Sequence, residues 1–126
     1  MAKSGIGKRT WVIGDGYIPA WSNGPEPEMA SHESASMLNT GDTDARVALT
    51  IYHEDREPVG PYHVIVPARR TLHQRFNDLS DPEPILPGRG YAVVIESDQP
   101  IVVQHTRLDS RQAANTIFST IAHPLD

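Results

Sequence analysis

The sequence predicts an all-β domain, a β-sandwich or jelly-roll-like fold of about eight short strands. Its apolar segments are short, and the 11 prolines and 9 glycines fall mostly between them. Several segments alternate apolar and polar residues, which is the period of a half-buried strand. No stretch has the apolar spacing of an amphipathic helix. Because no repeat or linker divides the 126 residues, we expect one domain over residues 1–126.

Three of the expected strands lie in the N-terminal part of the chain. The first covers residues 10–13 and precedes GDGYIPAWSNGPEPEM, whose prolines and glycines disfavour regular pairing. The second covers residues 32–38 and ends at the turn signal NTGD, residues 39–42. The third covers residues 46–52, where Val47, Leu49 and Ile51 alternate with other residues as in a half-buried strand.

The remaining five strands follow in order between proline-rich loops. The fourth strand covers residues 62–66 and ends before Pro67. The fifth covers residues 71–76 and precedes the loop DLSDPEPILPGRG. Strands at residues 91–96 and 101–107 are joined by SDQP, residues 97–100, a connection of hairpin size. Because both are apolar on both faces, we expect them in the middle of the sheets. The last strand covers residues 115–122.

Composition excludes several classes of protein. The formal net charge of -5 argues against non-specific binding of nucleic acid, so a nucleic-acid partner is not expected. The chain contains no cysteine and therefore forms no disulfide or thiolate metal site. It has no apolar run long enough for a secretory signal or a membrane span. These features predict a soluble, cytoplasmic protein without direct membrane insertion.

The sequence gives little support for catalysis, a metal or a cofactor. Six histidines are present, but none forms a His-x-His pair, and the adjacent His32 and Glu33 point to opposite faces of a strand. No Gly-x-Ser-x-Gly elbow occurs, and the glycine motifs lack the spacing of a phosphate-binding loop. We therefore expect a protein that is not an enzyme, with no metal and no cofactor.

The segment IVVQHTRLDSR, residues 101–111, is the most informative part of the chain, because an apolar strand runs into a polar tail. In an extended chain His105, Arg107, Asp109 and Arg111 share a face. His105 and Arg111 would then lie roughly 20 Å apart, too far to hold one small ligand. We expect His105 and Arg107 to bind a ligand, and Asp109 and Arg111 to brace a turn or a subunit contact. The alternative for Arg107 is an ion pair with Asp109 within the fold.

Two other groups of polar residues are candidates for binding. Glu26 and Glu28 alternate with prolines that stiffen the backbone, which suits a binding loop or a subunit contact. Arg69 and Arg70 follow a strand end, where guanidinium groups can grip anions or hydroxyl-rich ligands. The aromatic side chain of Trp21 suits stacking on a planar ligand, although filling a core or an interface is more common.

Long phrases of the sequence resemble the sensory rhodopsin transducer family, the small soluble partners of microbial sensory rhodopsins. They are GYIPAWSNGPEPEMASHES, LNTGD, IYHEDREPVGPYHVIVPARRTLHQRFNDL, DPEPI and PIVVQHTRLDSRQAANTIFSTIA, which together reach from about residue 11 to residue 122. The resemblance implies an all-β homotetramer of the cytoplasm that is not an enzyme. It also implies membership of a wider group of small-molecule-binding domains, with sugars as suspected ligands.

On this resemblance, the polar residues of the matching phrases become the expected ligand-binding set: Glu26, Glu28, His32, Glu33, Arg69, Arg70, His105 and Arg107. Two hypotheses follow. The first is a signalling adaptor, an oligomer that receives a signal from a membrane photoreceptor. The second is a regulatory module that binds a sugar or sugar acid and has no rhodopsin partner. A third reading, a metal-dependent enzyme on a cupin-like barrel, would require bound metal.

Overall fold

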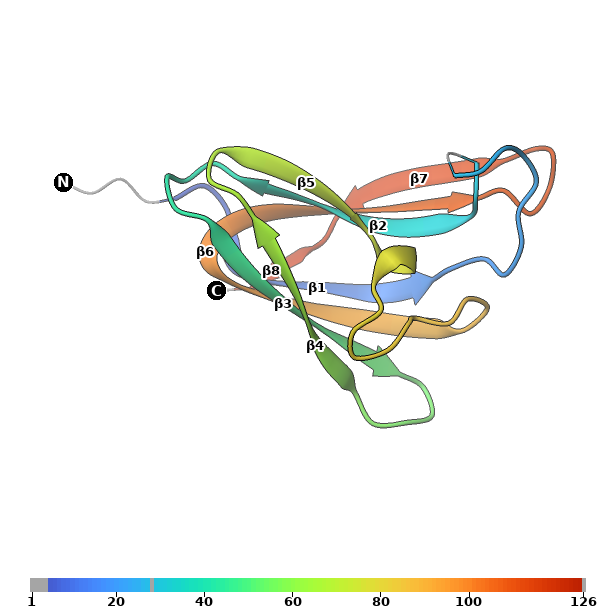
Figure 1. The fold of residues 1–126 in the computed structure, drawn as a ribbon, viewed down its shortest axis with the longest axis horizontal. Coiled ribbons are helices and arrows are strands. Elements are labelled where there is room, and N and C mark those ends of the chain that lie inside the picture. The colour runs from blue at the N-terminus through green and yellow to red at the C-terminus, as the bar shows by residue number, and fades with distance from the viewer. Residues whose placement is uncertain (1–4, 28, 126) are drawn as a thin grey trace.

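The computed structural model describes residues 5–27 and 29–125, and these form eight antiparallel strands in two packed layers (Figure 1). The strands are β1 (Lys8–Tyr17), β2 (His32–Asn39), β3 (Ala45–His53), β4 (Val59–Val66), β5 (Arg70–Arg75), β6 (Gly90–Asp109), β7 (Thr116–Ile121) and β8 (His123–Leu125). One 3-10 turn, η1 (Phe76–Asp78), follows β5. The prediction of an all-β, sandwich-like domain is confirmed. No helix within the described residues has the length and apolarity needed to cross a membrane.

Strand β6 belongs to both layers. Its first half lies between β1 and β3 in the layer ordered β4-β3-β6-β1-β8. Its second half lies between β2 and β7, and β5 completes that layer beside β2. In Figure 1 the strand curves at one end of the molecule from the lower layer into the upper one. The expected central position of these residues is therefore correct.

The hairpin predicted at residues 97–100 is wrong, because β6 continues through this segment. Lys8 pairs with Ile101 and Thr10 with Glu96, so the intervening residues of β6 form a bulge opposite β1. Asp98 is held there because its Oδ1 accepts a hydrogen bond from the backbone N–H of Arg46 at 2.8 Å. The turn-like residues thus bend one strand between layers instead of ending it.

Three other parts of the chain also differ from the prediction: the end of β1, the C-terminal strand β8 and the residue after β5. β1 continues through Gly14 and Gly16 to Tyr17, beyond the expected end at Ile13. Gly16 fits there because a Cβ at this position would lie 2.4 Å from the ring of Tyr91. The short strand β8, which pairs with residues 10–12 of β1, was not expected. Phe76 belongs to η1 and not to the preceding strand.

The core lies between the two layers. It consists of the inward-facing residues of strands in which inward-facing and outward-facing residues alternate. Val47, Leu49 and Ile51 of β3 belong to the same continuous buried cluster as Ala35 and Met37 of β2. Trp11 is also buried, and its indole N–H donates to the backbone oxygens of Lys8 and Ile101. The packing of both layers against each other fixes the inward positions on which the polar site described below depends.

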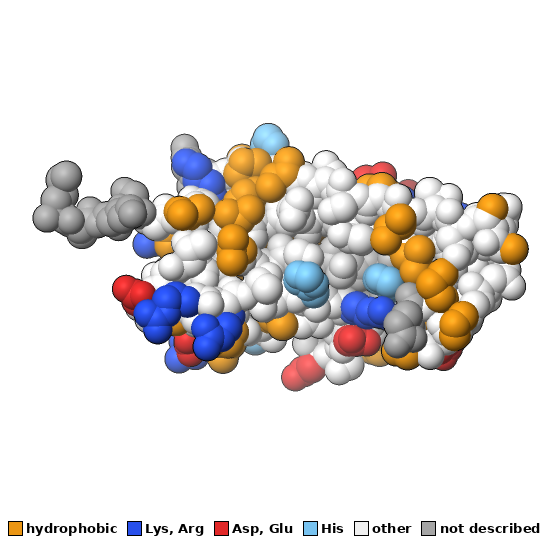
Figure 2. All heavy atoms as spheres, turned by 90° about the horizontal axis from the view of Figure 1, so that it is seen from above, with side chains coloured by type: hydrophobic (Ala, Val, Ile, Leu, Met, Phe, Trp, Pro, Cys, Tyr) orange, Lys and Arg blue, Asp and Glu red, His pale blue; other side chains and the backbone are white. Residues whose placement is uncertain are grey.

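The outer surface of β2, β6 and β7 is unusually free of charge, and we call it the neutral face. Figure 2 looks onto this layer and shows mostly uncharged side chains across its middle, with the largest group of lysine and arginine side chains at one end. By alternation and register this face carries no Asp, Glu, Lys or Arg and consists of His32, Ser34, Ser36, Leu38, Val102, Gln104, Thr106, Leu108, Ile117, Ser119 and Ile121. Within the described residues its strand β7 pairs with β6 alone, and its other edge is open.

Candidate functional site

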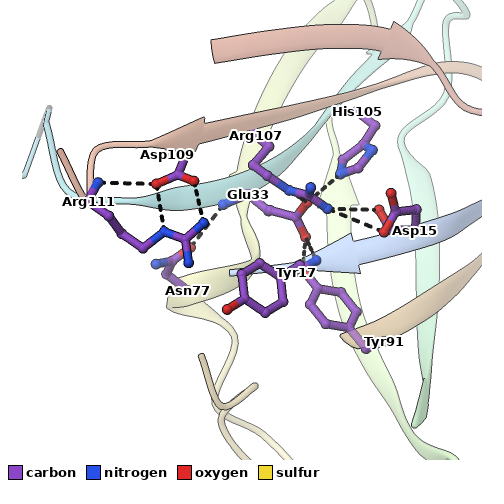
Figure 3. A network of polar contacts seen from close by, with 9 residues as sticks. All are labelled: Asp15, Tyr17, Glu33, Asn77, Tyr91, His105, Arg107, Asp109 and Arg111. Carbon is purple, nitrogen blue, oxygen red and sulfur yellow. Dashed lines mark hydrogen bonds and ion pairs between the residues drawn. The ribbon is translucent and has the colours of Figure 1, made fainter. Parts of the chain in front are cut away.

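A buried carboxylate, Glu33, lies at the centre of the polar network in Figure 3. Glu33 stands on β2 at an inward position of the alternation that also buries Ala35 and Met37. Its side chain has no exposed surface. A charge in such a place is tolerated only when several hydrogen-bond donors surround it.

Four donors meet the two oxygens of Glu33. On Oε2, His105 Nε2 lies at 2.9 Å and Arg107 Nε at 2.8 Å, both from β6. On Oε1, the backbone N–H of Tyr17 donates at 2.7 Å, and the hydroxyl of Tyr91 donates a short bond. Arg107 is the cross-strand neighbour of Glu33 in the β2–β6 register. Because Tyr17 and Tyr91 come from the other layer, the carboxylate ties the two layers together.

The donors also determine the charge of the carboxyl. Burial acts to raise the pKa of Glu33, but the hydrogen bonds from His105, Tyr91 and Arg107 act in the opposite direction and leave its pKa below the ordinary value. The pKa of the Tyr91 phenol is raised by burial and by the adjacent Glu33 charge. Glu33 is therefore ionised and Tyr91 is a protonated donor at neutral pH.

A row of alternating arginine and aromatic side chains borders this network. The guanidinium of Arg107 lies 5.3 Å from the ring centre of Phe118 and 5.9 Å from that of Tyr17. The guanidinium of Arg111 lies 5.7 Å from the Tyr17 ring and 5.4 Å from the Trp21 ring. Arg107 also contacts Asp15, with Nη2 3.6 Å from a carboxylate oxygen. The charge of Arg107 is thus shared between Glu33 and Asp15.

The structure brings together three residues of the expected ligand-binding set, namely Glu33, His105 and Arg107. His32 is on the same strand as Glu33 but on its other face, and its Nδ1 lies 2.7 Å from the backbone oxygen of Ala30. Glu26 is exposed in the loop before β2, and Glu28 lies outside the described residues.

Arg69 and Arg70 lie far from this network. They follow β4, and Arg70 pairs with Asn39 at the opposite end of β2 from Glu33. Arg69 adopts a φ of +54° and contacts the exposed carboxylate of Asp42 at 3.3 Å. These two arginines therefore cannot share a small ligand with His105.

Asp109 and Arg111 pair with each other, and the expected alternative of an Arg107–Asp109 pair is not formed. Arg111 Nη2 lies 2.6 Å from Asp109 Oδ2. This contact lowers the pKa of Asp109, chiefly through the hydrogen bond from Arg111. The backbone oxygen of Arg111 accepts a hydrogen bond from the exposed indole of Trp21 at 3.3 Å. All three residues lie where the chain leaves β6 and meets the loop before β2.

Sequence reasoning did not predict the contacts of Tyr17 and Tyr91 with Glu33 or of Asp15 with Arg107, because these three residues lie on strands of the other layer. One signal was available for Glu33 itself. It shares its face of an alternating strand with Ala35 and Met37, which predicts a buried carboxylate that needs donors.

A groove of about 270 Å³ opens beside the network between β1 and β7. Its lining includes Ile13, Asp15, His105, Phe118 and Thr120. A larger hollow of about 560 Å³ at the other end of the molecule is lined by Ile6, Arg9, Asp42 and neighbouring turn residues, and all three of these side chains are exposed. Of these two hollows, the first reaches His105, a buried residue of the network. A further hollow of about 350 Å³ reaches Asp15 and Tyr91 from the side of β3. Among the described residues, no group of three or more histidines and carboxylates is arranged to hold a metal ion.

Fold and site together define a small antiparallel β-sandwich whose layers are tied by a buried carboxylate network. Residues 6–124 match the family described as Anabaena sensory rhodopsin transducer. The chain therefore belongs to that family, and the resemblance predicted from the sequence is confirmed.

Two solved structures are close to this one. The Anabaena sensory rhodopsin transducer is 58% identical, with a TM-score of 0.74, and the match covers 82% of this chain and 99% of that chain. The crystal structure of Thermotoga maritima 1070 is 34% identical, with a TM-score of 0.82, and covers 95% of this chain and 97% of that chain. No curated protein matches this chain.

Substitution of Glu33 by Gln should lower the free energy of unfolding by about 3 kcal/mol, because the amide cannot pair with both His105 and Arg107. The measurement is urea denaturation at neutral pH. Glu96→Gln is the control, since Glu96 is exposed on the same central strand β6. It should change stability by less than about 0.5 kcal/mol. Equal denaturation midpoints for the two variants would contradict the central role of Glu33.

The stability contributed by ionised Glu33 should also depend on pH. Since the folded pKa lies below the ordinary value of 4.5, this contribution is present above pH 4.5 and is lost as the pH falls through the lower, folded pKa. We expect the stability difference between the wild-type chain and Glu33→Gln to narrow over that acidic range. Urea midpoints measured from neutral to acidic pH test this, and a constant difference would be the contrary result.

Proposed function

We propose that this chain is a signalling adaptor that acts by binding and not by catalysis. It is a cytoplasmic homo-oligomer that receives a signal from a membrane photoreceptor. The observation that carries the proposal is the family match over residues 6–124, together with 58% identity to a protein named as the transducer of a sensory rhodopsin.

Subunit association is part of the proposal, and a tetramer is the expected state. The neutral face supports it as the contact surface. Two chains that each carry a net charge of -5 repel each other. This repulsion is weakest when they associate through a surface that carries no charged side chains. Leu38 and Ile117 on this face are 40% and 66% exposed. The open edge of β7 adds unpaired backbone groups and carries no charge or proline to block pairing with another chain.

The adaptor should bind the rhodopsin of its source organism in a light-dependent manner. The expected result is a dissociation constant that differs at least about threefold between darkness and illumination. The measurement is binding to purified rhodopsin in lipid nanodiscs, with retinal-free opsin as the control that cannot absorb light. Equal binding in darkness, in light and to empty nanodiscs would refute the adaptor role.

Gln104→Lys should weaken subunit association, because it places a positive charge in the middle of the neutral face, between Ser36 and Ile121. Facing copies would then oppose like charges. Light scattering after size-exclusion chromatography should shift toward the mass of one chain. Ala48→Lys is the matched control, since it adds the same charge to the outer surface of the other layer, beside Glu96. If Gln104→Lys keeps the wild-type mass, the contact lies elsewhere.

A second candidate function is a regulatory module that binds a small molecule, with a sugar or sugar acid as ligand and no rhodopsin partner. The groove between β1 and β7 favours this candidate, because it brings open volume to His105 of the buried network. The two functions are compatible, since an oligomeric adaptor can also bind a regulatory ligand.

A further inference from the structure

We propose that the groove between β1 and β7 binds an uncharged, hydroxyl-bearing small molecule, and that His105 accepts a hydrogen bond from one of its hydroxyls at Nδ1. This proposal rests on the second candidate function. It goes further by locating the site and naming the chemical class of its ligand.

The contact with Glu33 fixes which nitrogen of His105 can serve a ligand. His105 Nε2 lies 2.9 Å from Glu33 Oε2, and an ionised carboxylate can only accept, so Nε2 carries the hydrogen. In the neutral ring Nδ1 is then an acceptor. No hydrogen bond reaches Nδ1 from the described residues. Among those residues, every fully enclosed side-chain nitrogen or oxygen has a partner, so Nδ1 is in contact with open volume.

That open volume is the groove. His105 is only 4% exposed and is one of the residues lining it. The ring is held on one side by Glu33 and on another by Phe118, whose ring stands edge-on at 5.6 Å between centres. A buried acceptor with a fixed direction is the feature that distinguishes a binding site from an ordinary surface hollow.

The groove wall matches a ligand with both hydroxyl groups and an apolar surface. Thr120 is directly opposite His105 in the β6–β7 register, so its hydroxyl lies on the same side as the imidazole. Ile13 and Phe118 supply apolar surface. The volume of about 270 Å³ is just below the usual range for drug-sized ligands, which indicates a smaller molecule.

The charges at the groove favour a neutral ligand over an anionic one. Asp15 lines the groove, and its carboxylate would repel another carboxylate. Arg107 cannot offset this repulsion, because its guanidinium already contacts Glu33 and Asp15. A sugar acid, which the arginines of the sequence suggested, therefore fits less well than a neutral polyol.

The test uses three neutral polyols, D-xylose, methyl β-D-glucopyranoside and myo-inositol, with D-glucuronate as the anionic comparison. Nitrogen-15 NMR of the imidazole reports directly on His105 Nδ1, and titration gives the affinity. We expect at least one neutral compound to shift this resonance and D-glucuronate to bind at least about tenfold more weakly.

Variants on β7 separate the groove from the rest of the surface. Thr120→Leu should reduce the affinity at least about tenfold, because it covers the groove beside His105. Thr116→Leu makes the same substitution on the same face of β7, opposite Asp109 and outside the groove lining, and should leave the affinity unchanged. Both positions are exposed, and equal melting temperatures without ligand verify that both variants fold.

Three results would overturn the proposal: no shift of His105 with any neutral compound, equal binding by Thr120→Leu, or tighter binding of D-glucuronate. A broad thermal-shift screen separates this failure from failure of the second candidate function. A compound that stabilises wild-type chain and Thr120→Leu equally would retain a small-molecule module but place its site elsewhere. The absence of any stabilising compound would count against both.

Discussion

The ionised carboxylate of Glu33 is the constraint on which the structure depends. A charge removed from water needs several donors, and here they are drawn from β1, both halves of β6 and the backbone. The apolar core alone would permit small shifts of one layer over the other. The hydrogen bonds to the carboxylate restrict such shifts, because two of the donors, Tyr17 and Tyr91, belong to one layer and the other two, His105 and Arg107, belong to the other. The same interaction fixes the tautomer of His105, so the structural network and the proposed binding site depend on a single residue.

Much of the fold could be predicted from the sequence because alternation and proline punctuation are local signals. The strands around Val47 and Met37 follow directly from them. The hairpin at residues 97–100 could not be judged in this way, because whether SDQP turns or bulges depends on distant partners. Lys8 and Thr10 hold the segment from β1, and the backbone of Arg46 holds Asp98. Likewise β8 could not be predicted locally, because its pairing partner is the distant strand β1.

In the candidate site, too, local features could be predicted from the sequence and contacts between distant residues could not. His105 and Arg107 were identified from their spacing on one strand, and Glu33 from the family resemblance, but nothing local places them around one carboxylate. The arginines were expected to bind an anionic ligand, but two of them form ion pairs within the fold. Arg107 pairs with Glu33 and Asp15, and Arg111 pairs with Asp109. Cross-layer partners such as Tyr91 have no sequence signature, since 58 positions separate that residue from Glu33.

The continuity of β6 also has a kinetic meaning. This strand contacts β1, β2, β3 and β7, so neither layer can be completed until residues from both ends of the chain have met it. Folding must therefore close long loops before most hydrogen bonds form, which is the topology of a slow-folding domain. Since no sheet is whole without β6, neither layer can persist as a folded remnant. Loss of order at one end of this strand is transmitted to the other as a single cooperative event.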